Sequence, residues 1–180
     1  MVRGGYRRAS VDETVMAVWY GRVMARLRSS LAFPWPASSV WPYLIALEQV
    51  PRWEDDVLAV EVLTPGDVAV GTRLRAQRVY AGRPAMLEGT IVGVEPGRLA
   101  TMELRGGPLE LVVATYAVDP TGDATSVVSY TATIRLRGLA RVLAPVVPLM
   151  GRIQIEKNLR RLQRRIAAGI PPTSDAPTPD

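Results

Sequence analysis

Short apolar segments, separated at regular intervals by turn residues, fill the chain from residue 57 to residue 136. Several of them alternate apolar and polar side chains, which is the period-two pattern of half-buried strands. The separating segments are rich in Gly, Pro and Asp and have the length of hairpin turns. The predicted strands are residues 29–34, 57–63, 72–80, 85–94, 99–104, 109–118 and 124–136. This pattern predicts an antiparallel meander of about seven strands.

A long helix is predicted over residues 138–168, between a glycine and a Gly-Ile-Pro-Pro sequence. Pro145 and Pro148 are expected to split off its first turn, because an interior proline lacks a backbone donor and clashes with the preceding turn. Its apolar residues form two groups on nearly opposite sides, namely Leu149, Met150 and Ile153, and Ile155, Leu159, Leu162 and Ile166. We therefore expect this helix to be covered on both sides. The combination predicts an α+β fold, in which a curved antiparallel sheet wraps around the C-terminal helix.

A shorter helix is predicted to start near residue 38, with Ser38 or Ser39 as its N-cap. Pro51 is expected to end it, and Trp53 follows directly before a Glu-Asp-Asp run. The body of the chain, residues 29–169, is expected to form one domain, followed by a disordered tail at residues 170–180.

Residues 1–28 are interpreted as an N-terminal extension. Five of its apolar residues fall at helical spacing, namely Met16, Trp19, Tyr20, Val23 and Leu27. Two alternatives remain: a helix here docks on the second apolar face of the C-terminal helix, or translation starts at Met24. A signal peptide is not expected, because acidic residues precede the short apolar run and arginines interrupt it. No segment approaches the roughly 18 apolar residues of a membrane span, so we expect a cytoplasmic protein.

The composition excludes several kinds of chemistry. The 180 residues include no Cys and no His, so disulfides, thiolate nucleophiles and the commonest transition-metal ligand are absent. We expect neither a metal nor a cofactor. The net charge is +5, and a cluster of basic residues lies near the C-terminus at Arg160, Arg161, Arg164 and Arg165. A solvated helix face explains this cluster as well as anionic membrane headgroups do, and without interleaved aromatic residues no nucleic-acid partner is expected.

Strand parity indicates a hollow interior. Several of the candidate inward residues are small, such as Ala76, Ala114 and Ala132, and others carry hydroxyl groups. A curved sheet lined by small side chains cannot easily fill the space over one helix. The expected result is an apolar cavity with a few polar groups, which is the form of a small-molecule site.

Six short sequences, in their order and spacing, resemble one known superfamily. They are Pro-Ala-Ser-Ser-Val-Trp at 36–41, Val-Pro-Arg-Trp-Glu at 50–54, Val-Gly-Thr at 70–72, Val-Glu-Pro-Gly-Arg-Leu at 94–99, Tyr-Ala-Val-Asp-Pro at 116–120 and Leu-Arg-Arg-Leu at 159–162. Over residues 29–168 the chain resembles the SRPBCC or START-like superfamily, the polyketide cyclase/dehydrase and lipid-transport group with the Bet v 1-like helix-grip fold. Gln163 stands where these proteins usually have lysine. The matching sequences are structural, so they support the fold more strongly than an activity.

Members of this superfamily mostly bind hydrophobic ligands such as lipids, polyketides and quinones, and some cyclise or dehydrate bound polyketides. The resemblance therefore implies an internal site for a small hydrophobic molecule, in a monomer or a homodimer. The residues that we expect to line the site are Trp53, Arg78, Tyr80, Met86, Glu88, Met102, Tyr116, Tyr130 and Met150. The alternatives are core packing for the tryptophan and the methionines, and hydroxyl groups bonded to backbone for the tyrosines.

Catalysis would need a base near an acidic C–H group and a donor for the developing enolate. Without His, the candidates are Glu88, Glu103, Arg78, Arg105 and the three tyrosines named above. Either one of the two glutamates points inward with a raised pKa, or both lie on the solvent face, paired with arginines of neighbouring strands.

Three hypotheses result. The protein is a carrier or sensor of a hydrophobic ligand, which we favour, or a polyketide cyclase or dehydratase. The third hypothesis is a lipid-handling protein whose arginines contact anionic headgroups at a membrane surface.

Overall fold

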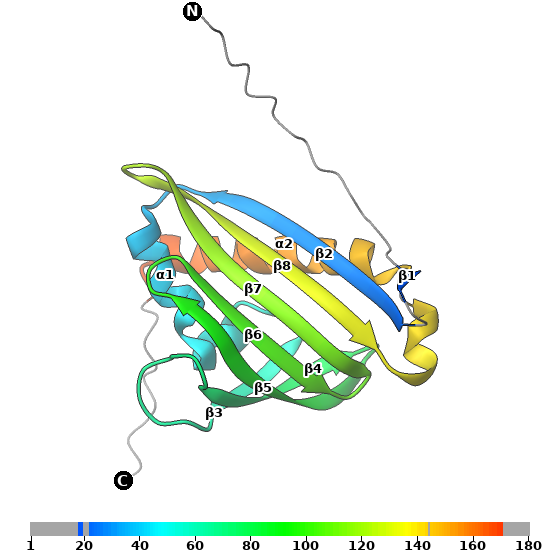
Figure 1. Ribbon diagram of the computed structural model, residues 1–180. Helices are drawn as coiled ribbons and strands as arrows, with labels where there is room; N and C mark the ends of the chain where they lie inside the picture. Colours follow the sequence, from blue (N-terminus) through cyan, green and yellow to red (C-terminus); the bar gives the residue numbers. More distant parts are fainter. Residues whose placement is uncertain (1–17, 20–21, 144, 171–180) are drawn as a thin grey trace, which may run out of the picture.

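The computed structural model describes residues 18–19, 22–143 and 145–170 (Figure 1). In this part of the chain the strands are β1 (Val18–Trp19), β2 (Arg22–Phe33), β3 (Val57–Val62), β4 (Arg73–Tyr80), β5 (Arg83–Glu95), β6 (Leu99–Gly106), β7 (Leu109–Gly122) and β8 (Thr125–Leu136). They form one antiparallel sheet in the order β1-β2-β8-β7-β6-β5-β4-β3. The helices are α1 (Ala37–Ile45) and α2 (Val147–Ala167), with two 3-10 helices, η1 (Leu47–Arg52) and η2 (Gly138–Leu143).

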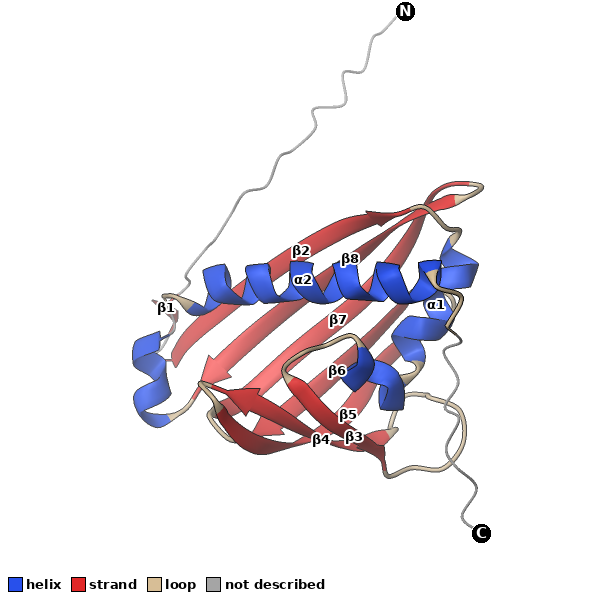
Figure 2. Ribbon diagram, turned by 180° about the vertical axis from the view of Figure 1, so that it is seen from behind, coloured by secondary structure: helices blue, strands red, loops and turns tan. Residues whose placement is uncertain are grey.

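Helix α2 lies across the concave side of the curved sheet, and α1 lies beside the C-terminal end of α2 (Figure 2). On the sheet side α2 buries Ile155, Leu159, Leu162 and Ile166 in the core. Gly151 lets the helix approach β2 closely, because a Cβ atom there would lie 2.9 Å from Leu27 Cδ2. The predicted α+β helix-grip fold, with about seven strands around a long C-terminal helix, is confirmed. The predicted split before the helix is confirmed as well, since η2 is separate and Pro148 lies in the first turn of α2.

Within the described residues α2 is covered on one side only, and the predicted second cover comes from none of them. Leu149, Met150 and Ile153 are 63%, 66% and 63% exposed. The sheet packs against only one side of the helix, and no other element within the described residues lies over the opposite side (Figure 2). The two apolar groups of α2 therefore have different environments, one in the core and one on the surface.

The predicted helix in the N-terminal extension is also wrong where the structure describes it. Residues from Arg22 onward belong to β2, which pairs with β8 from Met24 opposite Arg135 to Phe33 opposite Ser126. Buried positions 25, 27 and 29 alternate with exposed positions 26, 28 and 30. This period of two outweighs the helical spacing, because β8 satisfies the backbone donors and acceptors of the strand. The rest of the predicted helix, up to residue 17, and the tail from residue 171 lie outside the described residues.

The first helix begins earlier than predicted. Its N-cap is Pro36, whose backbone is extended, and neither Ser38 nor Ser39 caps it. The N–H group of Ser39 donates to Pro36 O at 2.9 Å, so the serines already belong to the first turn. Pro51 does not end the element either, since α1 stops at Ile45 and η1 continues through Arg52. Together, α1 and η1 lead the chain to the sheet at residue 53.

Candidate functional site

The connection between η1 and β3 places two consecutive side chains inside the protein. The N–H groups of Trp53 and Glu54 both donate to Val50 O, at 3.0 and 2.8 Å, which extends the turn of η1 by two residues. Trp53 is 1% exposed and Glu54 is 3% exposed. Burial of a large apolar side chain stabilises a fold by roughly 1.5–3 kcal/mol, so the indole anchors this connection and carries the neighbouring carboxylate inside with it.

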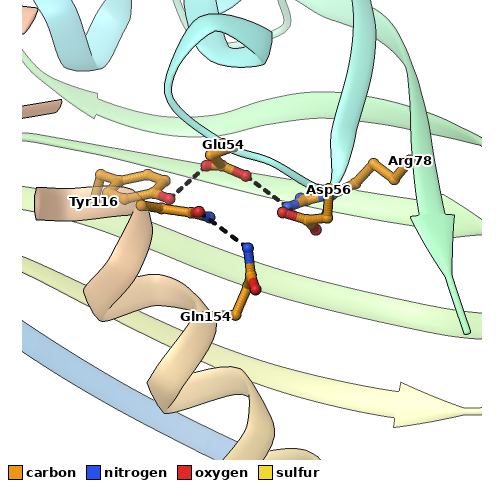
Figure 3. Close-up of polar contacts among 6 residues, drawn as sticks. Glu54, Asp56, Arg78, Tyr116 and Gln154 are labelled. Atoms are coloured by element: carbon orange, nitrogen blue, oxygen red, sulfur yellow. Dashed lines mark hydrogen bonds and ion pairs between the residues drawn. The ribbon is translucent and has the colours of Figure 1, made fainter. Parts of the chain in front are cut away.

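Glu54 is held by partners from two strands (Figure 3). Its Oε1 accepts a hydrogen bond from the Tyr116 hydroxyl of β7, and its Oε2 accepts one from Arg78 Nη2 of β4, both at 2.6 Å. The same guanidinium donates to Asp56 Oδ2 from Nε at 3.1 Å and from Nη2 at 2.8 Å. One buried cation therefore faces two carboxylates, with the phenol of Tyr116 as a further donor. We call these four residues the Glu54 cluster.

Two aromatic rings fix the position of Tyr116. The ring of Trp53 packs edge-on against it with a centroid distance of 5.7 Å, and the ring of Tyr130 lies tilted at 4.7 Å. Aromatic pairs favour these separations and angles. The phenol is thereby held with its hydroxyl directed at the carboxylate of Glu54.

Burial shifts the protonation equilibria of the Glu54 cluster. It raises the pKa of the Glu54 carboxyl, against the opposing charge of Arg78. Burial also raises the pKa of the Tyr116 hydroxyl well above its ordinary value, and the Glu54 carboxylate adds to this shift. For Arg78, burial alone would lower the pKa, but the carboxylates of Glu54 and Asp56 outweigh it and raise the pKa. The cluster combines a carboxyl that binds a proton more readily than usual with a phenol that stays a neutral donor.

A cavity of about 40 Å³ adjoins the Glu54 cluster. Its wall includes the apolar side chains of Leu44, Leu47, Trp53, Ala76, Met102 and Ala114. A water molecule needs roughly 10–15 Å³ of such volume, so the cavity has room for a few waters and not for a fatty chain. The cavity has the expected apolar wall with a few polar groups, but it is smaller than the hydrophobic ligand that we expected it to hold. Side chains of α1, η1 and Trp53 occupy the space that the alanines of the sheet leave free.

The cavity wall also contains an unpaired donor. Trp53 Nε1 is buried and has no hydrogen-bond partner among the described residues. Leaving such a group unpaired costs about 1–3 kcal/mol. Trp53 is thus both part of the cavity wall and the carrier of an unpaired donor.

The sequence model of one protein family, described as polyketide cyclase / dehydrase and lipid transport, matches residues 24–167. The chain belongs to this family. No curated protein matches the chain. The description of the polyketide cyclase and lipid-transport family covers both the ligand-binding and the cyclase hypotheses.

Solved structures with the same fold include a START superfamily protein from Mycobacterium smegmatis, with a TM-score of 0.70 and 12% identity over 79% of this chain and 97% of that chain. The Zhui aromatase/cyclase from a Streptomyces species has a TM-score of 0.65 and 15% identity, over 82% of this chain and 99% of that chain. A Thermus thermophilus protein has a TM-score of 0.66 and 21% identity, over 81% of this chain and 99% of that chain. These likenesses confirm the helix-grip fold of the family.

Five of the nine predicted site residues meet at the cavity, namely Trp53, Arg78, Met102, Tyr116 and Tyr130. Tyr80 lies two residues beyond Arg78 on β4, half-buried and outside the cavity wall. Burial raises the pKa of Tyr80 to about 12, although the charge of Arg78 opposes this shift. Residues from β4, β6, β7 and β8 thus converge on one cavity.

The other three predicted residues point away from the interior. Met86 and Met150 are 50% and 66% exposed, and Glu88 is exposed as well. On β5 the buried residues are Leu87, Gly89 and Ile91, so positions 86 and 88 face solvent. The prediction that these three side chains line an internal site is therefore wrong.

Glu88 and Glu103 lie together on the outer face of the sheet. In the strand register Glu88 is opposite Arg75 of β4 and Arg105 of β6. Glu103 pairs with Arg105 at 3.4 Å. The alternative in which both glutamates lie on the solvent face is thus confirmed, although Glu103 pairs with an arginine of its own strand. Neither glutamate can act as a base inside the cavity.

The buried acid that the sequence reasoning missed is Glu54. The signal was present in the sequence as three consecutive carboxylates directly after a tryptophan, Glu54, Asp55 and Asp56. The middle one points elsewhere: Asp55 Oδ2 pairs with Lys157 Nζ of α2 at 2.8 Å, and its Oδ1 pairs with Arg161. The three residues therefore join one connection to both the sheet and the helix.

Two further observations limit the chemistry of the described residues. Among them no group of three His, Cys, Asp or Glu side chains is arranged to hold a metal ion. None of their helices is both long enough and apolar enough to cross a membrane.

Proposed function

We propose that this protein binds a small hydrophobic molecule with one polar group in the cavity beside Glu54. The observation that carries the proposal is the composition of the wall, in which mostly apolar side chains surround a few polar groups, among them Glu54, Arg78 and Tyr116. Small-molecule sites have this composition. Membership in a family of polyketide cyclases and lipid-transport proteins supports the same conclusion.

The polar group of the ligand is expected to be a carbonyl or hydroxyl oxygen. Trp53 Nε1 offers an unpaired donor. Arg78 and Tyr116 offer donors that, without a ligand, are hydrogen-bonded to the carboxylate of Glu54. A ligand carboxylate fits poorly, because it would add a third negative charge next to Glu54 and Asp56. We therefore favour a neutral lipid or polyketide over a fatty acid anion as the natural ligand.

Binding requires the cavity to enlarge. The present volume of about 40 Å³ is far below the roughly 300–1,000 Å³ of ligand pockets. The large side chains that fill the space come from α1, η1 and Trp53, whereas the opposite wall is made of paired strands. Entry of a ligand therefore displaces α1 and η1 from the sheet.

Filling the cavity from the sheet side should abolish binding. Ala76→Leu adds three carbon atoms at a position that is 4% exposed and lines the cavity. The affinity for a neutral fluorescent probe, the methyl ester of cis-parinaric acid, is expected to fall at least tenfold, as the added carbons take the space the probe needs. Fluorescence titration of the full chain measures this.

The matched control is Ala59→Leu on the adjacent strand β3, where the side chain is exposed. It should leave the affinity unchanged. Thermal unfolding verifies that both variants are folded at the temperature of the titration. If Ala76→Leu binds the probe as tightly as the parent protein does, the cavity is not the binding site.

A second function, cyclisation of a bound polyketide, is favoured by the contact between Glu54 and Tyr116. The Glu54 carboxylate would remove a proton from a carbon between two carbonyl groups of the substrate. The enolate would form a C–C bond to a second carbonyl carbon, and the resulting alkoxide would take a proton from Tyr116 or from protonated Glu54. Burial raises the pKa of Glu54 above its ordinary value, which favours the return of a proton to this carboxylate after it has acted as a base.

For this reaction, Glu54→Gln and Tyr116→Phe should each reduce the cyclisation rate of a linear poly-β-ketone thioester by about 100-fold or more. Glu88→Gln and Glu103→Gln are matched controls on the outer face and should leave the rate unchanged. Product formation measured by chromatography tests this. If the Glu54 and Tyr116 variants retain the full rate, the protein is a binder without this chemistry.

A further inference from the structure

Six exposed apolar residues lie along η2 and the first half of α2. They are Leu139, Val142, Val146, Leu149, Met150 and Ile153, with exposed fractions from 45% to 91%. The last four recur at helical spacing, and at about 100° per residue they lie on one side of α2. That side is opposite the buried residues Leu159 and Leu162. We call these six residues the apolar stripe.

Within the described residues no element covers the apolar stripe. Figure 2 shows α2 as the front layer of the molecule, and its main packing partner is β2 behind it. Isolated exposed apolar side chains are ordinary, but a contiguous group marks an interaction surface. The stripe is therefore an exposed apolar surface that a partner can bury.

The charge around the stripe indicates what that partner is. Residues 137–170 contain eight basic residues and one acidic residue, Glu156, which is a net charge of +7. The whole chain carries +5, so the remaining residues carry −2. The positive charge of the protein is thus concentrated in η2 and α2.

Three basic residues lie on the same side of α2 as the stripe, nearer to the C-terminal end of the helix. At the same helical angle, Ile153 is followed by Lys157, Arg160 and Arg164, which are exposed. These four residues line an open hollow on the outer side of α2. The outward face of α2 is therefore apolar in its first half and basic in its second half.

We propose that the apolar stripe and the adjoining basic face dock on an anionic lipid bilayer. Amphipathic helices bind bilayers in this way, with apolar side chains at the boundary of the acyl chains and Lys or Arg at the anionic headgroups. Guanidinium groups bind phosphate oxygens with two parallel hydrogen bonds. Leu149, Met150 and Ile153 insert, and Arg160 and Arg164 contact phosphates.

The same charges argue against other occupants. A second copy of the chain would bring two basic faces together, each with Lys157, Arg160 and Arg164, and like charges oppose this contact. Residues 1–17 carry three basic and two acidic residues, so they offer no charge complementary to α2. An anionic bilayer matches both the apolar and the basic half of the face. This inference does not depend on the ligand of the internal cavity.

Vesicle co-sedimentation of the full chain tests the proposal. The protein should bind vesicles of phosphatidylcholine with about 30% phosphatidylglycerol more tightly than vesicles of phosphatidylcholine alone, and less tightly as NaCl increases. Serine at Leu149, Met150 and Ile153 together should weaken binding at least tenfold. Arg164→Gln should weaken binding about fivefold.

The controls use equally exposed residues elsewhere. Serine at Leu58, Val70 and Val92, which are 51%, 65% and 42% exposed, should leave vesicle binding unchanged, as should Arg73→Gln. The proposal is overturned if anionic vesicles are not bound, or if the stripe variant binds them like the parent protein. It is also overturned if sedimentation velocity shows a dimer that only the stripe variant loses, because a second copy then covers the stripe.

Discussion

Replacing Arg78 by methionine should lower the free energy of unfolding by about 3–5 kcal/mol. Arg78 Nη2 contacts Glu54 at 2.6 Å and Asp56 at 2.8 Å, and the side chains of Arg78 and Glu54 are 17% and 4% exposed. Methionine fills much of the same space but leaves the two carboxylates without their cation. Urea denaturation at pH 7 measures the loss.

Arg75→Met is the matched control on the same strand. Arg75 pairs with Glu61 at 3.5 Å, but both side chains are largely exposed, so its loss should cost less than about 1 kcal/mol. Equal losses for the two variants would mean that the Glu54 cluster contributes no more than a surface ion pair.

The pH dependence of the Arg78 variant follows from the raised pKa of Glu54. Since burial raises this pKa in the folded state, the folded protein binds more protons than the unfolded protein above the ordinary value of 4.5. Stability contributed by protonated Glu54 is therefore lost as pH rises from there through the folded pKa. Arg78 lowers the pKa of Glu54, so its removal raises this pKa further and makes the loss of stability with rising pH larger. Arg78→Met should therefore lower the free energy of unfolding less at pH 5 than at pH 8.

Leu162→Ala should lower the free energy of unfolding by about 2–5 kcal/mol. Leu162 is fully buried between α2 and the sheet, and its truncation leaves a cavity in a packed interior. Ile153→Ala, nine residues earlier on the same helix, removes an apolar side chain that is 63% exposed. It should change stability by less than about 0.5 kcal/mol.

Thermal or urea unfolding of the two α2 variants decides whether the helix packs on one side or on two. A loss of 2 kcal/mol or more for Ile153→Ala in the isolated protein would mean that part of the chain covers the outward face. The vesicle experiment and this one are independent, because stability is measured without lipid.

The fold could be predicted because its signals are local. Turn residues and alternation fixed six of the seven long strands, and the prolines near residue 148 marked the start of α2. The prediction failed at β2, where helical spacing from Met16 to Leu27 competed with strand alternation. Pairing of Met24 with Arg135, more than a hundred residues away, decided this competition, and no local pattern contains that information.

The site could be predicted only in part, for the same reason. The resemblance to a ligand-binding superfamily pointed to Arg78, Tyr116 and Tyr130, which lie on strands, where side chains alternate between two faces. Glu54 lies in a connection, where no periodicity applies, and its partner Tyr116 is 62 residues away. The size of the cavity also escaped prediction, since it depends on how far Trp53 and η1 reach across the sheet.

The run from Glu54 to Asp56 has a mechanical consequence. Alternate carboxylates attach the same four-residue connection to β4 and β7 on one side, and Asp55 attaches it to Lys157 and Arg161 of α2 on the other. Helices α1 and η1 therefore cannot move away from the sheet independently of α2. When α1 and η1 move away from the sheet, either the ion pairs of Asp55 break or α2 moves with them. The motions of α1, η1 and α2 are therefore coupled.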